Sequence, residues 1–247
     1  MPETLKRELH EATAQVRSLL QDLLHLGVRE IDVAVLPRDL PACPPQVRGV
    51  DEGGVALCRH ETLDEIRSEL EGCRRCSLCQ GRKNIVFGVG NPHARLVFVG
   101  EAPGREEDEK GEPFVGEAGR LLDRILFAMG MQREEVYICN VEKCRPPGNR
   151  DPGPEEIAAC EPYLKRQLAA IRPQMIVALG KFAAQTLLRD ETPIGRLRGK
   201  WREYEGIPLM PTYHPAFLLR NPAEKRAVWE DMKQVLARMR EKPEAKA

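Results

Sequence analysis

The chain has 247 residues, and its 38 basic and 38 acidic residues give a formal net charge of zero. This length suits one sizeable α/β domain with a small addition, and the charge balance excludes a uniformly basic nucleic-acid binder. The longest apolar run, 175–179, is too short to span a membrane, and the charged start of the chain predicts no secretory signal. We therefore expect a cytoplasmic protein without membrane association, whose eight cysteines bind metal or react rather than form disulfides.

The first 65 residues are expected to form an N-terminal extension. Apolar residues recur at three- and four-residue steps over 3–26, which predicts an amphipathic helix. The Pro- and Gly-rich stretch 36–54 is typical of a linker. We interpret 1–65 as an extension for packing or for an unknown protein partner, 66–241 as the main domain and 242–247 as a flexible tail.

The main domain alternates between predicted strands and helices. Apolar runs predict four strands, at 96–99, 136–140, 175–179 and 207–214. Helices are predicted at 62–71, 116–129, 154–171, 181–188 and 223–240. This alternation indicates a four-stranded parallel sheet with helices on both faces. Prolines in the fourth strand favour an edge position for it.

Polar residues follow each of these strands. Glu101 follows the first, Asn140 ends the second, Lys181 follows the third and His214 ends the fourth. Because the carboxyl ends of parallel strands meet at one edge of the sheet, a carboxylate, an amide and an imidazole should converge there. The stretch 95–119 has the form of an active-site loop, since a buried strand opens at Gly100 into a long polar segment.

The cysteines suggest a metal site. Cys73 and Cys76 form a C-x2-C pair, and Cys144 and Cys160 follow the second strand. Four such thiolates could hold zinc or a 4Fe-4S cluster, and their spacing alone does not decide between the two. Cys79 extends the first pair, but Lys83 stands where a ferredoxin pattern would need the next cysteine.

Taken together, these motifs resemble the iron–sulfur, family-4 branch of the uracil-DNA glycosylase superfamily. The resemblance covers about residues 73–240. It is carried by GEAPG (100–104), GEPFVGEAG (111–119), YICNVEKCRPPGNRDP (137–152), EEIAACEPYL (155–164), VALG (177–180) and TYHPAFLLRNP (212–222).

The resemblance implies a three-layer α/β/α sandwich and a repair enzyme. Such an enzyme flips uracil out of DNA and hydrolyses its N-glycosidic bond, which releases free uracil and leaves an abasic site. The cofactor implied is a 4Fe-4S cluster, held by Cys73, Cys76, Cys144 and Cys160. We expect a monomer acting in the cytoplasm, at the nucleoid, on single- or double-stranded DNA that contains uracil.

Each chemical task can be assigned to a residue. Glu101 would polarise the attacking water, and His214 would donate a hydrogen bond to uracil O2. Phe114 would stack on the flipped base, and the Asn140 amide matches uracil N3–H and O4. The backbone at Ala102 and Gly104 would approach O2.

The DNA-binding side is predicted from charge and from one apolar loop. Leu218, with Phe217 as second choice, would enter the base stack as a wedge. A basic face would contact the phosphates of the DNA backbone and would include Arg145, Arg150, Lys181, Arg198 and Arg220.

Two other functions compete with this one. A hydrolase of free nucleotides could use the same carboxylate at the sheet edge, but it would need neither a wedge nor a basic flank. A non-catalytic DNA-binding module stabilised by a structural zinc site would need neither Glu101 nor His214.

Overall fold

A computed structural model of the chain describes residues 13, 17, 20–21, 24 and 61–241. The five isolated N-terminal positions lie within the predicted 3–26 helix and are helical and exposed. The rest of that helix, the linker 36–54 and the tail 242–247 lie outside the described residues. No helix in the described part is long and apolar enough to cross a membrane.

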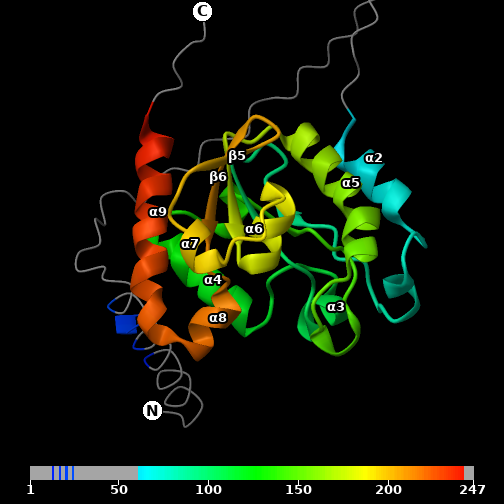
Figure 1. Cartoon of the computed structure of the whole chain (residues 1–247), viewed down its shortest axis with the longest axis horizontal. Helices are drawn as coiled ribbons and strands as arrows, with labels where there is room; N and C mark the ends of the chain where they lie inside the picture. Colours follow the sequence, from blue (N-terminus) through cyan, green and yellow to red (C-terminus); the bar gives the residue numbers. More distant parts are fainter. Residues whose placement is uncertain (1–12, 14–16, 18–19, 22–23, 25–60, 242–247) are drawn as a thin grey trace, which may run out of the picture.

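A six-stranded mixed sheet forms the centre of the domain, in the order β1-β3-β2-β4-β6-β5 (Figure 1). The inner four strands are parallel, and the two outer strands pair antiparallel to them. The strands are β1 (Val89–Gly90), β2 (Leu96–Gly100), β3 (Tyr137–Asn140), β4 (Met175–Leu179), β5 (Arg202–Tyr204) and β6 (Ile207–Thr212).

Helices cover both faces of the sheet, which confirms the three-layer prediction (Figure 1). The α-helices are α2 (Leu63–Leu70), α3 (Arg105–Lys110), α4 (Glu117–Ala128), α5 (Pro154–Ile171), α6 (Lys181–Leu188), α7 (Ile194–Leu197), α8 (Pro215–Arg220) and α9 (Lys225–Arg240). Short 3₁₀ turns lie at Ser77–Gln80, Arg133–Glu135, Pro147–Asn149 and Pro222–Glu224.

The alternation of side chains along the central strands divides the core in two. On β2, Leu96 and Phe98 point to the face covered by α4, α8 and α9, whereas Val97 and Val99 point to α5, α6 and α7. Successive strand residues face opposite sides of a sheet, so a strand apolar throughout must be covered on both. A third, smaller cluster packs α2 onto α5 through Ile66.

The prediction of four strands with the fourth at the edge is wrong in the strand count and in the edge position, because the short strands β1 and β5 flank the four predicted strands. A short fifth strand pairs with the first half of β6, from Arg202 opposite Leu209 to Tyr204 opposite Ile207. Pro211 lies beyond the reach of this strand, so its missing N–H interrupts no bond on that side.

A second difference concerns the charged run after β2. The sequence predicts a loop there, and the structure has the two-turn helix α3, which ends at Gly111 with φ of 77°. Glycine tolerates this left-handed conformation and allows the chain to turn back towards Phe114.

Candidate active site

A cavity of about 480 Å³ opens at the carboxyl edge of the parallel strands. Side chains and backbone from the ends of β2, β3, β4 and β6 line it, as expected for an open α/β sheet. The structure brings nine of the predicted site residues to this cavity: Glu101, Ala102, Gly104, Phe114, Asn140, Arg150, Lys181, His214 and Arg220. Arg145, Arg198 and Leu218 do not line it.

Glu101 is the first residue after β2, and its carbonyl accepts a hydrogen bond from the Glu142 N–H at 3.0 Å. This bond extends the pairing of β2 with β3 and fixes the backbone from which the carboxyl group projects. Burial raises the pKa of Glu101 to about 7, the Asp151 carboxylate adds to the rise, and Lys181 opposes it. A carboxyl group with a pKa near 7 is suited to acid–base work at neutral pH.

Asn140 ends β3 and is 2% exposed. Among the described residues its Oδ1 has no hydrogen-bond partner, although buried polar atoms are normally paired. Gly100 lets the amide approach, since a Cβ there would lie 2.3 Å from Asn140 Oδ1 and 2.7 Å from Phe114 Cζ. The unpaired oxygen is therefore available to a ligand in the cavity.

Phe114 lies beside this amide in an unusual backbone conformation. Its φ is 54°, a value that residues other than glycine, asparagine and aspartate seldom adopt. The side chain is 5% exposed. The ring stacks with that of His214, with centroids 5.5 Å apart and 29° between the planes. Phe114 thus presents an aromatic surface to the cavity.

His214 caps the N-terminus of α8. Its Nδ1 accepts the Ala216 N–H at 3.0 Å, so in the neutral imidazole the proton is on Nε2. Burial, with Arg220 as a second cause, lowers the pKa of His214 to about 4. At neutral pH the ring is an uncharged hydrogen-bond donor at Nε2.

Two acidic residues of α3, for which the sequence suggested no partner, hold the surrounding loops. Glu107 Oε1 accepts the N–H groups of Val115 and Gly116, each at 3.0 Å. Asp108 is 2% exposed, and its Oδ1 accepts the Lys83 N–H at 2.8 Å. The Asp108 contact joins segments 25 residues apart, and the Glu107 contacts form across the chain reversal at Gly111, so neither could be read from a helical or strand period.

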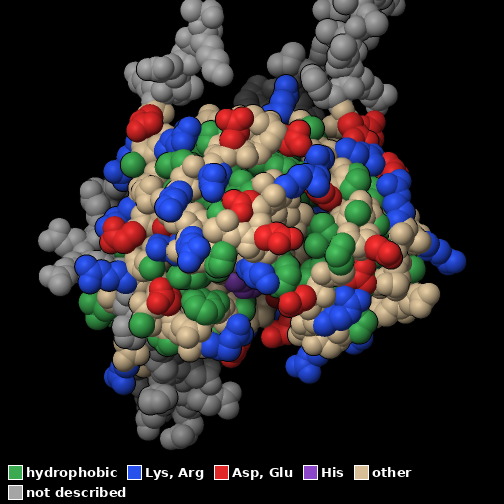
Figure 2. Space-filling model, in the orientation of Figure 1, with side chains coloured by type: hydrophobic (Ala, Val, Ile, Leu, Met, Phe, Trp, Pro, Cys, Tyr) green, Lys and Arg blue, Asp and Glu red, His purple; other side chains and the backbone are tan. Residues whose placement is uncertain are grey.

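The predicted basic residues differ in how free their charges are. Arg150 is paired with Glu156 at 2.6 and 2.8 Å, and Arg198 is paired with the buried Asp231. Arg145 donates from Nε to Asn149. Lys181 and Arg220 are exposed at the cavity. On the face drawn in Figure 2, several basic side chains gather near α6 and α8.

The predicted wedge residue does not project outwards. Leu218 is 0% exposed and belongs to the core, where α8 packs on α4. Its neighbour Leu219 is 41% exposed. The sequence predicts a loop here, whereas the structure has the six-residue helix α8, and its packing shows which of the two leucines faces outwards.

The four predicted cysteine ligands, with Cys79, line one small pocket. Burial raises the pKa of the Cys160 thiol to about 12 and also raises that of Cys144, on which the Cys73 and Cys76 thiols act in the same direction. Cys79 lines the same pocket as Cys76, so the preference for Cys76 as a ligand rests on its C-x2-C spacing to Cys73.

Hydrogen-bond donors point at two of the sulfurs. Arg82 Nη1 lies 3.3 Å from Cys144 Sγ, and the Lys143 N–H lies 3.3 Å from Cys160 Sγ. The Lys143 side chain is fully buried, and its Nζ donates to the Asn140 carbonyl at 2.6 Å. Positive charge and donors around a set of thiols fit an anionic, thiolate-bound group.

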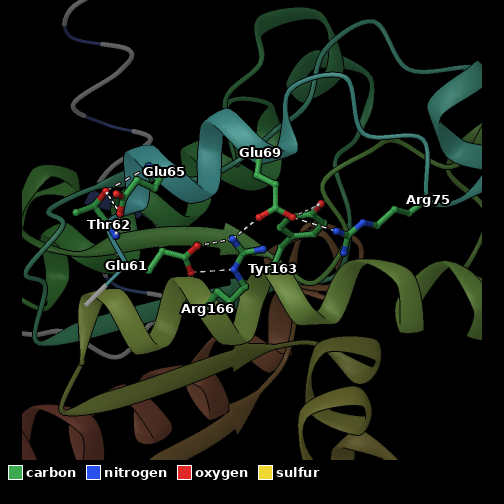
Figure 3. Close-up of polar contacts among 7 residues, drawn as sticks. All are labelled: Glu61, Thr62, Glu65, Glu69, Arg75, Tyr163 and Arg166. Carbon is green, nitrogen blue, oxygen red and sulfur yellow. Dashed lines mark hydrogen bonds and ion pairs between the residues drawn. The ribbon is translucent and has the colours of Figure 1, made fainter. Parts of the chain in front are cut away.

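An ion-pair network fixes the first cysteine segment to the helix that carries Cys160 (Figure 3). Arg166 on α5 pairs with Glu61, which precedes α2, and with Glu69, which lies in the last turn of α2. Glu69 also pairs with Arg75, whose guanidinium lies over the Tyr163 ring, 4.8 Å from its centroid. The network holds α2, and with it the segment that follows, against α5.

Comparison with known proteins agrees with this architecture. The family model described as "Uracil DNA glycosylase superfamily" matches residues 87–233. A type-4 uracil-DNA glycosylase of Archaeoglobus fulgidus is 50% identical over 183 residues, which are 71% of this chain and 92% of that protein. A type-4 enzyme of Thermotoga maritima is 46% identical over 178 residues, 70% of this chain and 93% of its own length. The chain therefore belongs to the uracil DNA glycosylase superfamily and is an enzyme of its type-4 branch.

Proposed function

We propose that this enzyme flips uracil out of DNA and hydrolyses its N-glycosidic bond, releasing free uracil and leaving an abasic site. The observation that carries the proposal is the unpaired, buried Oδ1 of Asn140 beside the Phe114 ring, in a cavity that also contains Glu101 and His214. Enzymes that act on a base within DNA read its hydrogen-bonding edge and stack it against apolar side chains.

The Asn140 amide would read the edge of uracil. Its carbonyl oxygen would accept from N3–H, and its amide nitrogen would donate to O4. Cytosine has an acceptor at N3 and a donor at N4, so it would leave both amide groups unpaired in a buried site. Each unpaired group costs about 1–3 kcal/mol, which supports selection of uracil over cytosine.

The bond would be broken by groups already in place. The Glu101 carboxylate would polarise the attacking water and stabilise positive charge on the sugar. The Nε2–H of His214 would donate to uracil O2 as negative charge develops on the leaving base. Backbone at Ala102 and Gly104 would lie close to the same oxygen. His214 does not have to transfer a proton to uracil, because the neutral ring already has an N–H group at Nε2 that can donate a hydrogen bond.

The DNA strand would be held at the rim of the cavity. Lys181 and Arg220 are the predicted phosphate contacts whose charges are exposed at the rim. Arg145, Arg150 and Arg198 would also contact phosphates, although each already has a hydrogen-bond or ion-pair partner within the protein. Leu218 is buried, and Phe217 packs against the core and the Tyr213 ring, so we assign the wedge to the exposed Leu219. The duplex would be bent or unstacked at α8.

Leu219→Ala is expected to weaken uracil excision from duplex DNA more than from single-stranded DNA, because only the duplex must be unstacked. The measurement is the ratio of kcat/KM values on matched 20-nucleotide substrates. The control is Phe127→Ala, which removes an exposed apolar side chain from a different helix, α4, and should leave the ratio unchanged. An unchanged ratio for Leu219→Ala would remove the wedge assignment.

We propose that Cys73, Cys76, Cys144 and Cys160 hold a 4Fe-4S cluster. The donors at two sulfurs and the buried Lys143 ammonium fit an anionic group. The cluster would cross-link the two cysteine segments.

Cys76→Ser and Cys79→Ser provide a matched pair of variants. Loss of a ligand at 76 is expected to abolish the brown colour and iron content of the purified protein and to lower its Tm. The Cys79 variant should keep both properties, because the C-x2-C spacing to Cys73 assigns the ligand to Cys76. Absorbance near 400 nm, iron and zinc analysis and thermal denaturation make the test. Stoichiometric zinc in a colourless wild-type protein would contradict the assignment.

The function is tested with a labelled duplex that contains one uracil, followed by alkali treatment. Strand cleavage at uracil, and none in the matched thymine or cytosine duplex, is the expected result. Release of uracil from deoxyuridine but not from DNA would support the nucleotide hydrolase instead. Binding to the duplex without any base release would support the non-catalytic module. The monomeric state, the cytoplasmic location and a partner for residues 1–65 stay predictions.

A further inference from the structure

We infer that Glu107 and Arg133 form a two-sided clamp that positions Phe114 for uracil before the base arrives. The inference rests on the proposed function, in which the Phe114 ring stacks on the flipped base. Neither residue is proposed to touch the reacting atoms. Both would act through the backbone on either side of Phe114, as positioning residues.

The first side of the clamp is a carboxylate. Glu107 Oε1 accepts two consecutive N–H groups, those of Val115 and Gly116, each at 3.0 Å. These are the residues immediately after Phe114. One oxygen therefore fixes the orientation of two peptide planes. It does so from α3, a separate element whose N-cap residue, Gly104, lines the same cavity.

The second side is a guanidinium. Arg133 Nη1 donates to the Phe114 carbonyl at 3.1 Å, and Arg133 Nη2 donates to the Pro113 carbonyl. Nη1 also lies 3.0 Å from Asp123 Oδ1 on α4, which holds the guanidinium from outside. The Arg133 side chain is 21% exposed, so these bonds are sheltered from water on most sides. The planar fork of arginine suits two neighbouring carbonyls.

The backbone between the two sides needs such support. Phe114 has φ of 54°, a conformation that persists in a bulky residue only where the surroundings over-determine it. The first turn of α4 also packs closely against this peptide, since a Cβ at Gly119 would lie 1.8 Å from the Phe114 carbonyl oxygen. The four clamp bonds, two to N–H groups and two to carbonyls, oppose relaxation to an extended backbone.

Relaxation would move the ring that faces the cavity. The Phe114 ring stacks with His214 and lies against Gly100, beside the Asn140 oxygen. A shift of the ring would therefore displace the stacking surface relative to the group that reads the base. Misplacement by about 1 Å can cost about 10²-fold in rate. The clamp is thus expected to act on kcat/KM through the position of one ring.

The test is a double-mutant cycle on uracil excision. Glu107→Ala is expected to lower kcat/KM by about 10–100-fold in the wild-type background. In a Phe114→Ala background the same change should cost less than about 2-fold, because the ring it positions is gone. Glu107→Gln should retain most activity, since its carbonyl oxygen can accept both N–H groups. Arg133→Met should repeat the pattern of Glu107→Ala if the clamp has two sides.

Controls separate the clamp from stability and from the proposed function. Glu109→Ala removes an exposed carboxylate of the same helix, which pairs with Lys83, and should leave kcat/KM unchanged. Amide exchange at 115 and 116 should quicken in Glu107→Ala, a readout that needs no reaction. Additive losses in an active enzyme, or unchanged exchange, would overturn the clamp. A wild-type protein that excises no uracil, with 115 and 116 protected, would instead overturn the proposed function.

Discussion

Replacement of Glu101 by glutamine is expected to lower the single-turnover rate of uracil excision by about 10²–10⁴-fold, the range typical of a positioned general base. Glutamine preserves the size of the side chain but can neither take a proton nor carry the charge that stabilises the sugar cation. Binding of DNA that contains an abasic analogue should change little, because Glu101 lies within the cavity and not at its rim. A variant that kept more than a third of the rate would exclude the proposed role.

The pH dependence of the wild-type enzyme tests the same residue independently. The pKa of Glu101 is about 7, and the carboxylate is the active form. Activity should therefore fall about tenfold for each pH unit below 7 and level off above it. The Glu101→Gln variant should lack this limb.

Stability should change with pH in the opposite direction to activity. A carboxyl group whose pKa is raised in the folded state contributes most when protonated, and this contribution is lost as pH rises from about 4.5 through 7. Glu101→Gln should therefore have a higher Tm than the wild type at pH 8.

His214→Ala is expected to slow excision by about 10²–10³-fold, the usual cost of removing one donor from a developing oxyanion. The donor is preset, because the Ala216 N–H occupies Nδ1 and leaves the proton on Nε2. Since the pKa of His214 is about 4, the ring stays neutral throughout the range in which Glu101 titrates, and it should add no limb between pH 5 and 8.

A second histidine provides the control for this variant. His93 is exposed and lies away from the cavity, so His93→Ala should leave the rate unchanged. The comparison requires single-turnover rates at pH 8, with thermal denaturation to show that both variants are folded. Equal rates for His214→Ala and the wild type would mean that uracil O2 is stabilised by backbone donors alone.

The part of the site that could be predicted is the part fixed by strand topology. Glu101, Asn140 and His214 lie at or just after the carboxyl ends of three parallel strands, and such ends share an edge, so their convergence follows from the order of elements. The edge strands β1 and β5 were missed because two or three residues carry no period-2 signal.

Contacts between distant segments could not be predicted in this way. Glu107 meets Val115 only because α3 forms and the chain reverses at Gly111. Arg198 appeared free in the sequence, yet its partner Asp231 comes 33 residues later on another helix. Partners brought together by packing leave no pattern at helical or strand spacing.

The cysteine pocket joins chain segments that are separated by about 70 residues, between Cys76 and Cys144. A cluster bound across them would restrict the conformations of the unfolded polypeptide as a disulfide does. For a closed loop of that length, the chain-entropy relation gives about 4 kcal/mol. Disulfides do not persist in a reducing environment. In such an environment, an iron–sulfur cluster would provide the cross-link that disulfides provide in secreted proteins. Loss of iron would then lower the free energy of unfolding.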